Sequence, residues 1–254
     1  MEDIKTISLV SGSSVQEIEY YLDKLRSYAR AIDLEVSDDQ LLLCIHHLLL
    51  VIETNKRFNL TRILNIDDAL ILHILDSLSF APYVENAPLG DLLDIGTGAG
   101  FPAIPLAVAS SRVTVALDSI GKKIDAVASF ASELGLSNLH AVHDRVELFA
   151  LDNRNRFSCV VSRAVASLPV LIEYAAPLLC DHGLLVVSKG KPSQDEIDSG
   201  FQAARICGFQ YSDSHQFDLP DDLGHRNIFI FQKVRSPYIK LPRAIGLARK
   251  KPLA

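Results

Sequence analysis

The stretch LLDIGTGAG, residues 92–100, joins an apolar run to an acid and then to three glycines at alternate positions. Ligands of open α/β sheets bind beyond the carboxyl ends of the strands, beside the turn that follows the first strand. A glycine-rich turn directly after a strand-like run therefore predicts an α/β fold with a ligand at this turn. Glycines also serve tight turns that bind nothing, so the surrounding sequence has to identify the ligand.

The spacing of the glycines disfavours two common phosphate-binding loops. The dinucleotide pattern G-x-G-x-x-G needs a glycine at position 101, where this chain has Phe101. No G-K-[ST] follows, so the turn is not a P-loop. The motif present is D-x-G-x-G-x-G, and Pro102 after it suits the first turn of a helix, where a missing N–H costs nothing.

A second acid indicates what the turn holds. Asp118 ends the next β-branched run, 18 residues beyond Gly100. A carboxylate at this place can accept hydrogen bonds from both hydroxyls of a ribose. The combination resembles the S-adenosylmethionine site of class I methyltransferases. A nicotinamide cofactor and a loop without any ligand remain the alternatives.

From residue 91 onward, short β-branched runs alternate with amphipathic stretches, a pattern that builds a parallel sheet covered on both faces. Two late runs, 209–217 and 226–234, predict an antiparallel pair at the sheet edge. We therefore expect an α/β, Rossmann-like class I methyltransferase fold with a seven-stranded, mostly parallel sheet.

Residues 14–84 predict helices, because apolar positions recur at intervals of three and four. Ser14 and Ser37 stand where N-caps are expected, and the last helical pattern stops near Pro82. The predicted division is a helical N-terminal cap over residues 1–85 and a methyltransferase domain with a basic C-terminal tail over 86–254.

The composition predicts a folded cytoplasmic protein without a membrane-spanning helix. Of the 254 residues 48% are hydrophobic, and no apolar run is long enough to span a bilayer. The N-terminus does not read as a secretion signal. The four cysteines lie far apart with no C-x-x-C pair, which favours reduced thiols over a disulfide or zinc site.

The net charge of −6 argues against general affinity for nucleic acid, but the charge is unevenly distributed. Seven basic residues and no acid lie between Lys233 and Lys251. This tail is either a solvated segment without function or an arm that contacts phosphates.

The turn after the predicted fourth strand bears on which atom is methylated. Enzymes that methylate exocyclic amines commonly carry [DN]-P-P-[aromatic] there, whereas this chain has Ser162-Arg163-Ala164 and no Pro-Pro. Methylation of a pyrimidine carbon needs a cysteine, and Cys159 lies within the strand, where a buried thiol is expected. A ring nitrogen such as guanine N7 needs neither device, only alignment. We therefore expect no acid or base among the catalytic residues.

Seven motifs, among them the glycine loop, carry a resemblance to one family over the chain from about residue 15 to the C-terminus. The chain resembles the ribosomal RNA small subunit methyltransferase G family, also called the glucose-inhibited division protein B family. The resemblance implies S-adenosylmethionine-dependent methylation of N7 of one guanine, guanine 527, in bacterial 16S rRNA. The motifs are NLTRI (59–63), HILDSL (73–78), LLDIGTGAGFPAIPLA (92–107), LDSIGKK (117–123), DRVE (144–147), VSRAVASL (161–168) and SKG (188–190).

The resemblance also assigns roles to residues. Val146 and Glu147 would lie by the adenine, Asp118 and Ser119 by the ribose, and Arg163 at the reaction cleft. The full predicted cofactor set is Asp94, Gly96, Thr97, Gly98, Gly100, Phe101, Asp118, Ser119, Val146, Glu147 and Arg163.

The expected partner is 16S rRNA or the small ribosomal subunit, bound by a monomer. The tail departs from the family's closing stretch at Leu241 and Ala244, which leaves individual tail contacts open. The RNA-contacting candidates are Asn59, His73, Lys189, Arg226, Lys240, Arg243, Lys250 and Lys251.

His73 and Asp76, three apart on one helix, could in principle hold a metal. Because no third ligand is evident, we expect none. Two rival functions remain for the chain as a whole: a small-molecule methyltransferase, and a non-catalytic RNA-binding module with a vestigial ligand site.

Overall fold

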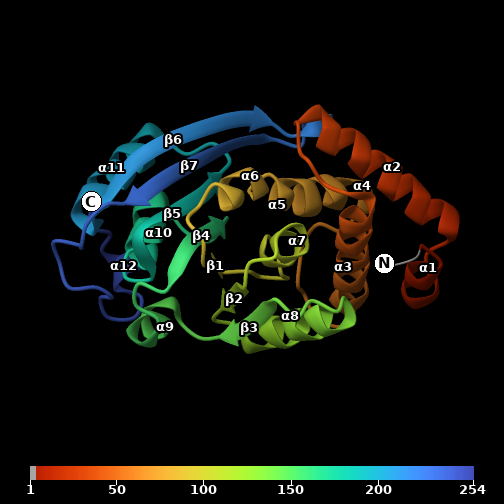
Figure 1. The fold of residues 1–254 in the computed structure, drawn as a ribbon, viewed down its shortest axis with the longest axis horizontal. Coiled ribbons are helices and arrows are strands. Elements are labelled where there is room, and N and C mark those ends of the chain that lie inside the picture. The colour runs from red at the N-terminus through yellow and green to blue at the C-terminus, as the bar shows by residue number, and fades with distance from the viewer. Residues whose placement is uncertain (1–3) are drawn as a thin grey trace.

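A seven-stranded sheet forms the centre of the computed structural model, which describes residues 4–254 (Figure 1). The strand order is β3-β2-β1-β4-β5-β7-β6; β1 to β5 are parallel, and β7 runs antiparallel to both β5 and β6. This arrangement confirms the predicted fold class, including the late antiparallel pair. The strands are β1 (Asp91–Ile95), β2 (Thr114–Asp118), β3 (Leu139–His143), β4 (Phe157–Arg163), β5 (Leu179–Lys189), β6 (Phe209–Asp218) and β7 (His225–Lys233).

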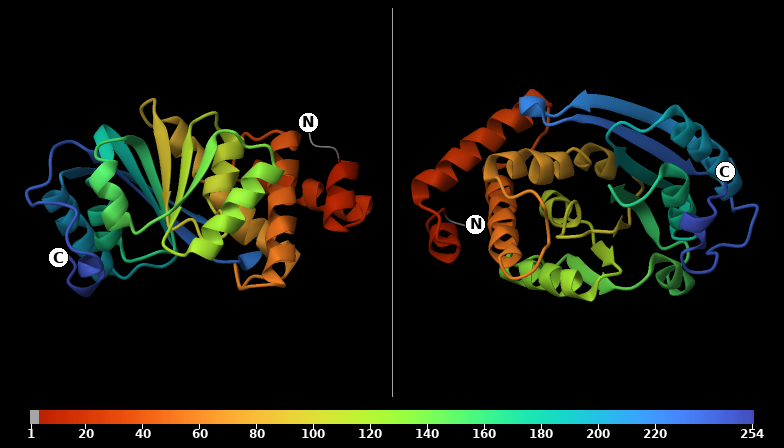
Figure 2. Two further views of the ribbon diagram at one scale, coloured as in Figure 1. Left: turned by 90° about the horizontal axis from the view of Figure 1, so that it is seen from below. Right: turned by 180° about the vertical axis from the view of Figure 1, so that it is seen from behind.

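Helices cover both faces of the sheet (Figure 2). Successive side chains of a strand point to opposite faces. Leu93 and Val115 accordingly pack with the helices α9, α10 and α11, whereas Ala116 packs with α7, α8 and the N-terminal helices. The covering helices are α7 (Ala103–Ala109), α8 (Gly121–Glu133), α9 (Val146–Asp152), α10 (Leu168–Ala175) and α11 (Gln194–Cys207).

The N-terminal region contains helices and no strand within residues 4–85, and it shares its core with the sheet domain. Ser14 and Ser37 each form the predicted N-cap as a complete capping box. Buried residues of α3 lie in one cluster with residues of α7 and α8. The boundary near residue 85 stays a prediction. The elements are α1 (Ile4–Ser11), α2 (Val15–Ala31), α3 (Asp38–Asn55), α4 (Ile66–Ala69), η1 (Leu70–Leu75), α5 (Asp76–Leu78) and α6 (Ala81–Glu85).

Two features differ from the expected regular helix that ends near Pro82. The segment η1 is a π-helix, which inserts a wider turn between α4 and α5 and is frequent at functional sites. Pro82 does not end a helix but lies in the first turn of α6, where its missing N–H leaves no hydrogen bond unmade. Neither feature follows from apolar periodicity, because both depend on how the backbone turns locally.

After β7 the chain passes the amino ends of β4 and β5 at residues 236–241 and then forms the short helix α12 (Leu247–Lys250), which contacts α10. The turn between β6 and β7 contains the 3-10 helix η2 (Pro220–Asp222). In residues 4–254 no helix combines the length and apolar character needed to cross a membrane. All four cysteines are unpaired.

Candidate active site

The glycine loop after β1 requires glycine for conformational and steric reasons. Gly96, Gly98 and Gly100 have φ angles of 79°, 61° and 94°, in the left-handed region that L side chains rarely adopt. A Cβ at Gly96 would also lie 2.4 Å from Cγ2 of Val165. The loop is therefore held against the turn after β4 at Gly96, whereas a Cβ at Gly98 would meet nothing within 4 Å.

Asp118 pins this loop from the end of β2. Its Oδ2 accepts a hydrogen bond from the Gly98 N–H at 3.0 Å, and its Oδ1 accepts one from the Ile120 N–H at 3.0 Å. Each carboxylate oxygen has a further lone pair to offer. The geometry suits the predicted contact with a ribose diol.

Asp94 lies behind the loop, not in the cavity. Its side chain is fully buried, and its Oδ2 accepts a hydrogen bond from the Ala103 N–H at 3.2 Å, across the start of α7. Burial raises the pKa of Asp94 to about 7, while the hydroxyl of Thr97 works in the opposite direction. Asp94 thus connects β1 to the helix that follows the loop.

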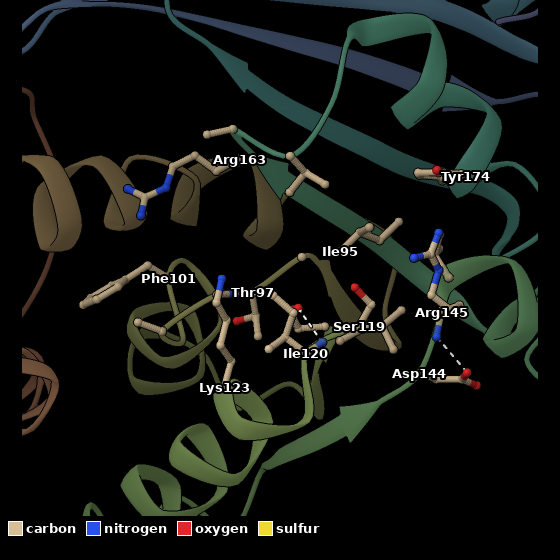
Figure 3. Close-up of a pocket in the computed structure, with 18 of the residues that line it drawn as sticks. Ile95, Thr97, Phe101, Ser119, Ile120, Lys123, Asp144, Arg145, Arg163 and Tyr174 are labelled. Atoms are coloured by element: carbon tan, nitrogen blue, oxygen red, sulfur yellow. Dashed lines mark hydrogen bonds between the residues drawn. The ribbon is translucent and has the colours of Figure 1, made fainter. Parts of the chain in front are cut away.

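A cavity of about 480 Å³ opens at the carboxyl ends of β1, β2, β3 and β4. Figure 3 shows Phe101 and Arg163 at one end of it and Arg145 and Tyr174 at the other. This volume is within the range of small-molecule and cofactor sites. The predicted residues that line the cavity are Gly96, Thr97, Gly98, Phe101, Asp118, Ser119, Val146, Glu147 and Arg163; Asp94 and Gly100 do not line it.

Other lining residues were not predicted from the sequence. Ile120, Asp144 and Arg145 follow the ends of β2 and β3 directly, so the rule that ligands lie beyond strand ends could have found them. Tyr174 on α10 and Arg249 on α12 reach the cavity only through tertiary packing. No local pattern indicates those two.

Phe101 is the centre of a ring cluster at the Arg163 end. The His73 ring stacks on it with centroids 4.5 Å apart and planes 7° apart, and the His47 ring lies 4.4 Å away. The Arg163 guanidinium lies 5.9 Å from the Phe101 centroid. Burial, together with the charge of Arg163, lowers the pKa of His73 to about 3, so this imidazole is neutral at physiological pH.

Asp76 joins two arginines from different strands. Its Oδ2 accepts a hydrogen bond from Nη1 of Arg163 at 3.0 Å, and its Oδ1 accepts one from Nε of Arg226 at 2.9 Å. Asp76 is only 2% exposed. The carboxylate therefore fixes the α5 segment to the ends of β4 and β7. Within residues 4–254 no group of three or more His, Cys, Asp or Glu side chains is placed to hold a metal.

A second cavity, of about 360 Å³, adjoins the first. The two share the residues His73, Arg163 and Ala164. The remaining wall of the second cavity contains two predicted RNA-contacting residues, Lys189 and Arg226, and is formed by Ile63, Leu72, Asp76, Ser188, Lys189, Gly190 and Arg226. A cofactor-sized space thus opens beside a separate space with a cationic wall.

The basic tail is docked on the first cavity instead of extending into solvent. The Gly246 N–H donates to Oε1 of Glu147 at 2.7 Å, and Arg249 donates to the Val165 carbonyl at 3.2 Å. Arg243 forms a bidentate pair with the buried carboxylate of Glu173, at 2.7 and 2.5 Å.

The remaining predicted RNA residues lie at different depths. The guanidinium of Arg243 is turned inward to Glu173, which removes it from our RNA-contacting candidates. Asn59, Lys240, Lys250 and Lys251 are exposed, whereas His73 is buried between the two cavities. Lys189 is half-buried and pairs with Glu196 at 2.8 Å.

Three comparisons place the chain among known proteins. The family model described as "GidB: rRNA small subunit methyltransferase G" matches residues 40–224. Ribosomal RNA small subunit methyltransferase G of Desulfitobacterium hafniense (strain Y51) is 38% identical over 225 residues, 87% of this chain and 93% of that protein. The protein of the same name from Staphylococcus haemolyticus is 38% identical over 207 residues, covering 80% of this chain and 86% of its own.

Among solved structures, TrmN from Thermus thermophilus superimposes with a TM-score of 0.50 at 15% identity, covering 62% of this chain and 48% of its own. This likeness concerns the fold alone. The family match spans the glycine loop, most of the sheet and the lining residues of both cavities except Arg226 and Arg249. The chain therefore belongs to the GidB family, rRNA small subunit methyltransferase G.

Proposed function

We propose that this protein transfers the methyl group of S-adenosylmethionine to N7 of one guanine, guanine 527, in bacterial 16S rRNA. The observation that carries the proposal is the pair of adjoining cavities. One is built on the glycine loop and Asp118, and the other has a wall of arginine and lysine side chains. The names of the relatives, rRNA small subunit methyltransferases, support rRNA as the substrate class.

The residues of the first cavity fit an adenosine-type ligand. Asp118 would accept the ribose hydroxyls, and the exposed side chain of Ile120 together with Val146 offers apolar surface for the adenine. Glu147 is buried, and its Oε2 has no hydrogen-bond partner among the described residues. The Arg145 Nε lies 3.8 Å from this oxygen, too far for a hydrogen bond, so an amino or hydroxyl group of the ligand would supply the donor. When bound, S-adenosylmethionine supplies a methyl group activated on a sulfonium.

The chemistry needs alignment more than proton transfer. The lone pair of guanine N7 forms the new bond to the methyl carbon, and the electrons of the broken C–S bond go to sulfur. No proton leaves the base, so no general base is required. Neutral His73 and the Asp76-held Arg163 lie where the two cavities meet, and they would fix the approach of the base to the methyl group. Alignment of this kind can supply about 7–11 kcal/mol of a barrier.

The RNA would reach the second cavity across a basic surface. Lys189 and Arg226 line that cavity, while Asn59, Lys240, Lys250 and Lys251 offer exposed contacts further out. The proposed partner is 16S rRNA or the small ribosomal subunit, bound by a monomer. Such a substrate places the enzyme in the cytoplasm, where ribosomes assemble.

The cofactor is tested by calorimetric titration of the purified protein with S-adenosylmethionine. We expect one saturable site per chain. Absence of saturable binding at millimolar concentration would overturn the methyltransferase proposal and favour a non-catalytic module.

The target is tested on 16S rRNA from a strain that lacks this gene. Borohydride and aniline cleave RNA at N7-methylguanosine, so the parent RNA should be cut at one position where the deletion RNA is not. Restoring the gene should restore the cut. Identical cleavage patterns in parent and deletion strains would exclude the N7 assignment and favour a small-molecule acceptor.

A further inference from the structure

Ser188, at the carboxyl end of β5, carries a buried hydroxyl for which the described residues provide no partner. The side chain is 2% exposed, and its Oγ makes no hydrogen bond in the part of the chain that the structure describes. Ser188 lines the second cavity and does not line the first. A buried hydroxyl without a partner is unfavourable, so a ligand that meets it inside the cavity gains by pairing with it.

A comparison with Ser162 on the neighbouring strand β4 shows that burial at this end of the sheet does not by itself leave a serine hydroxyl without a partner. Ser162 on β4 is fully buried as well, but its Oγ donates to the Ile95 carbonyl at 2.9 Å and it lines neither cavity. The next residue of β4, Arg163, is the register partner of Ser188. Two buried serines at the same end of the sheet thus differ in two respects: Ser188 lines a cavity, and it has no internal partner.

The other polar side chains of the second cavity are already engaged, apart from His73. Both oxygens of Asp76 accept hydrogen bonds from arginines, and Lys189 donates to Glu196 and to the Ala166 carbonyl. His73 has a free Nδ1, but it belongs to the wall shared with the first cavity. On the unshared wall, Ser188 is the polar side chain that makes no hydrogen bond at all within residues 4–254, whereas Asp76, Lys189 and Arg226 each make at least two.

The shape of guanine indicates which of its groups would meet Ser188. N7 has to face the first cavity, past the shared residues His73, Arg163 and Ala164. The edge of the purine opposite N7 carries the 2-amino group and N3. That edge would then face the unshared wall, where a serine hydroxyl can accept from the amino group and donate to N3.

We infer that Ser188 recognises the 2-amino edge of the target guanine and thereby selects guanine over purines that lack this group. The inference rests on the proposed function, since it takes guanine N7 as the acceptor. It adds a specificity-determining residue on β5 to a site otherwise defined by the cofactor loop. A site built to hydrogen-bond one group discriminates strongly against analogues without it, because its own polar atom is then left unpaired.

The test combines a substitution of Ser188 with a replacement of the target base in the RNA. Ser188→Ala and wild type are assayed with S-adenosylmethionine on small subunits reconstituted with 16S rRNA that carries either guanosine or inosine at the target position. Inosine keeps N7 but lacks the 2-amino group. With guanosine we expect Ser188→Ala to lower kcat/KM about tenfold or more. With inosine we expect a clearly smaller loss, because only the contact with N3 is then removed.

Two controls separate recognition from a general defect. Ser162→Ala should change the guanosine and inosine rates by the same factor, and Ser188→Ala should bind S-adenosylmethionine within about twofold of wild type. If Ser188→Ala is poorly folded, Ser188→Cys keeps the size while weakening the hydrogen bond and should show the same selective loss. An equal loss on both substrates, or no loss on guanosine, would overturn the inference.

Failure of the proposed function gives a different result. In that case wild type transfers no methyl group to the guanosine-containing subunit, whichever serine is present. Methyl transfer by wild type, with no dependence of the Ser188→Ala effect on the 2-amino group, contradicts the role of Ser188 alone.

Discussion

Gly96 is the position in the cofactor loop where a side chain has the least room. Its Cβ would collide with Val165, whereas a Cβ at Gly98 would meet nothing within 4 Å. Both residues have positive φ angles, so an alanine at either strains the backbone by roughly 1–2 kcal/mol. We expect Gly96→Ala to weaken S-adenosylmethionine binding more than Gly98→Ala, measured by calorimetry. The double change Gly96→Ala with Val165→Ala should recover part of the affinity; no recovery would show that the collision is not the cause.

Asp118 combines two functions at one carboxylate, since it holds the loop and faces the cavity. Asp118→Ala removes the acceptor for the Gly98 N–H and the proposed acceptor for the ribose. Hydrogen bonds to a charged group contribute about 1.5–3 kcal/mol, so we expect the Kd for S-adenosylmethionine to rise tenfold or more. Asp125→Ala, on the exposed side of α8, is the matched control. An unchanged Kd for Asp118→Ala would remove this residue from the cofactor site.

At the scale of helices and strands, local sequence patterns predicted the structure well. The β-branched runs predicted the strands, because parallel strands are buried on both faces and need apolar residues throughout. Ser14 and Ser37 predicted helix starts, because capping depends on the next three residues alone. Local logic also found the glycine loop after β1 and Asp118 at the end of β2, whereas Val146 and Glu147 after β3 came from the family resemblance. Apart from Gly100, these residues line the cavity.

Contacts between distant elements could not be predicted in this way. Asp76 bonds to Arg163 and Arg226, which lie 87 and 150 positions away in the chain. Its spacing from His73 raised a metal pair, which we did not expect, and a role in capping the active site or orienting the substrate. It did not indicate the two arginines, because they become neighbours only after folding. The docking of Arg243 on Glu173 is of the same kind, since a basic tail carries no signal for a single buried acid.

The docked tail allows a prediction about the Arg243–Glu173 pair. Glu173 is 3% exposed, so removing its partner leaves a buried carboxylate without compensation. We expect Arg243→Ala to lower the free energy of unfolding by about 3–5 kcal/mol in urea titrations, and to weaken S-adenosylmethionine binding, because Gly246 and Arg249 hold the same cavity wall. Lys250→Ala, on the exposed side of α12, should change neither quantity. Unaltered stability of Arg243→Ala would mean that the pair does not anchor the tail.

At the scale of the whole molecule, buried titratable groups around the loop set the dependence of stability on pH. Burial lowers the pKa values of His47 and His73 from 6.5 to about 3. Below pH 6.5 the unfolded chain takes up protons that the folded chain does not, so their contribution to stability is lost as pH falls towards 3. Asp94 works in the opposite direction, since its raised pKa of about 7 makes its contribution decline as pH rises through 7.

The effects of His47 and His73 on stability together exceed the opposite effect of Asp94. These three groups therefore make the folded state less stable at pH 5 than at neutral pH. Each histidine alone accounts for about 2 kcal/mol of this difference. His47 donates from Nε2 to the Ala99 carbonyl, and His47→Gln retains a donor without the titration. We expect the difference in unfolding free energy between neutral pH and pH 5, measured in urea, to shrink by about 2 kcal/mol in this variant. A difference as large as that of wild type would show that His47 does not titrate as its burial implies.

The position of the basic tail explains how a protein with a negative net charge can bind RNA. The chain carries a net charge of −6, yet its acid-free C-terminal segment is docked beside the cavity through Arg249. Lys250 and Lys251 follow Arg249 directly and are exposed. A local cationic surface next to the reaction site can attract RNA even when the whole molecule repels it, because screening limits each charge to about 8–10 Å.

This placement predicts how the two lysines act on RNA binding. Changing Lys250 and Lys251 to alanine should weaken binding to 16S rRNA or the small subunit and reduce the slope of log Kd against log salt by about 1.4–1.8, if each lysine neutralises one phosphate. The affinity for S-adenosylmethionine should stay the same, because neither lysine lines the cavity. Lys122→Ala, exposed on α8, serves as a control that should leave the slope unchanged. If the double variant keeps the wild-type slope, the phosphates are bound elsewhere, and the docked tail serves to close the cofactor site instead of contacting RNA.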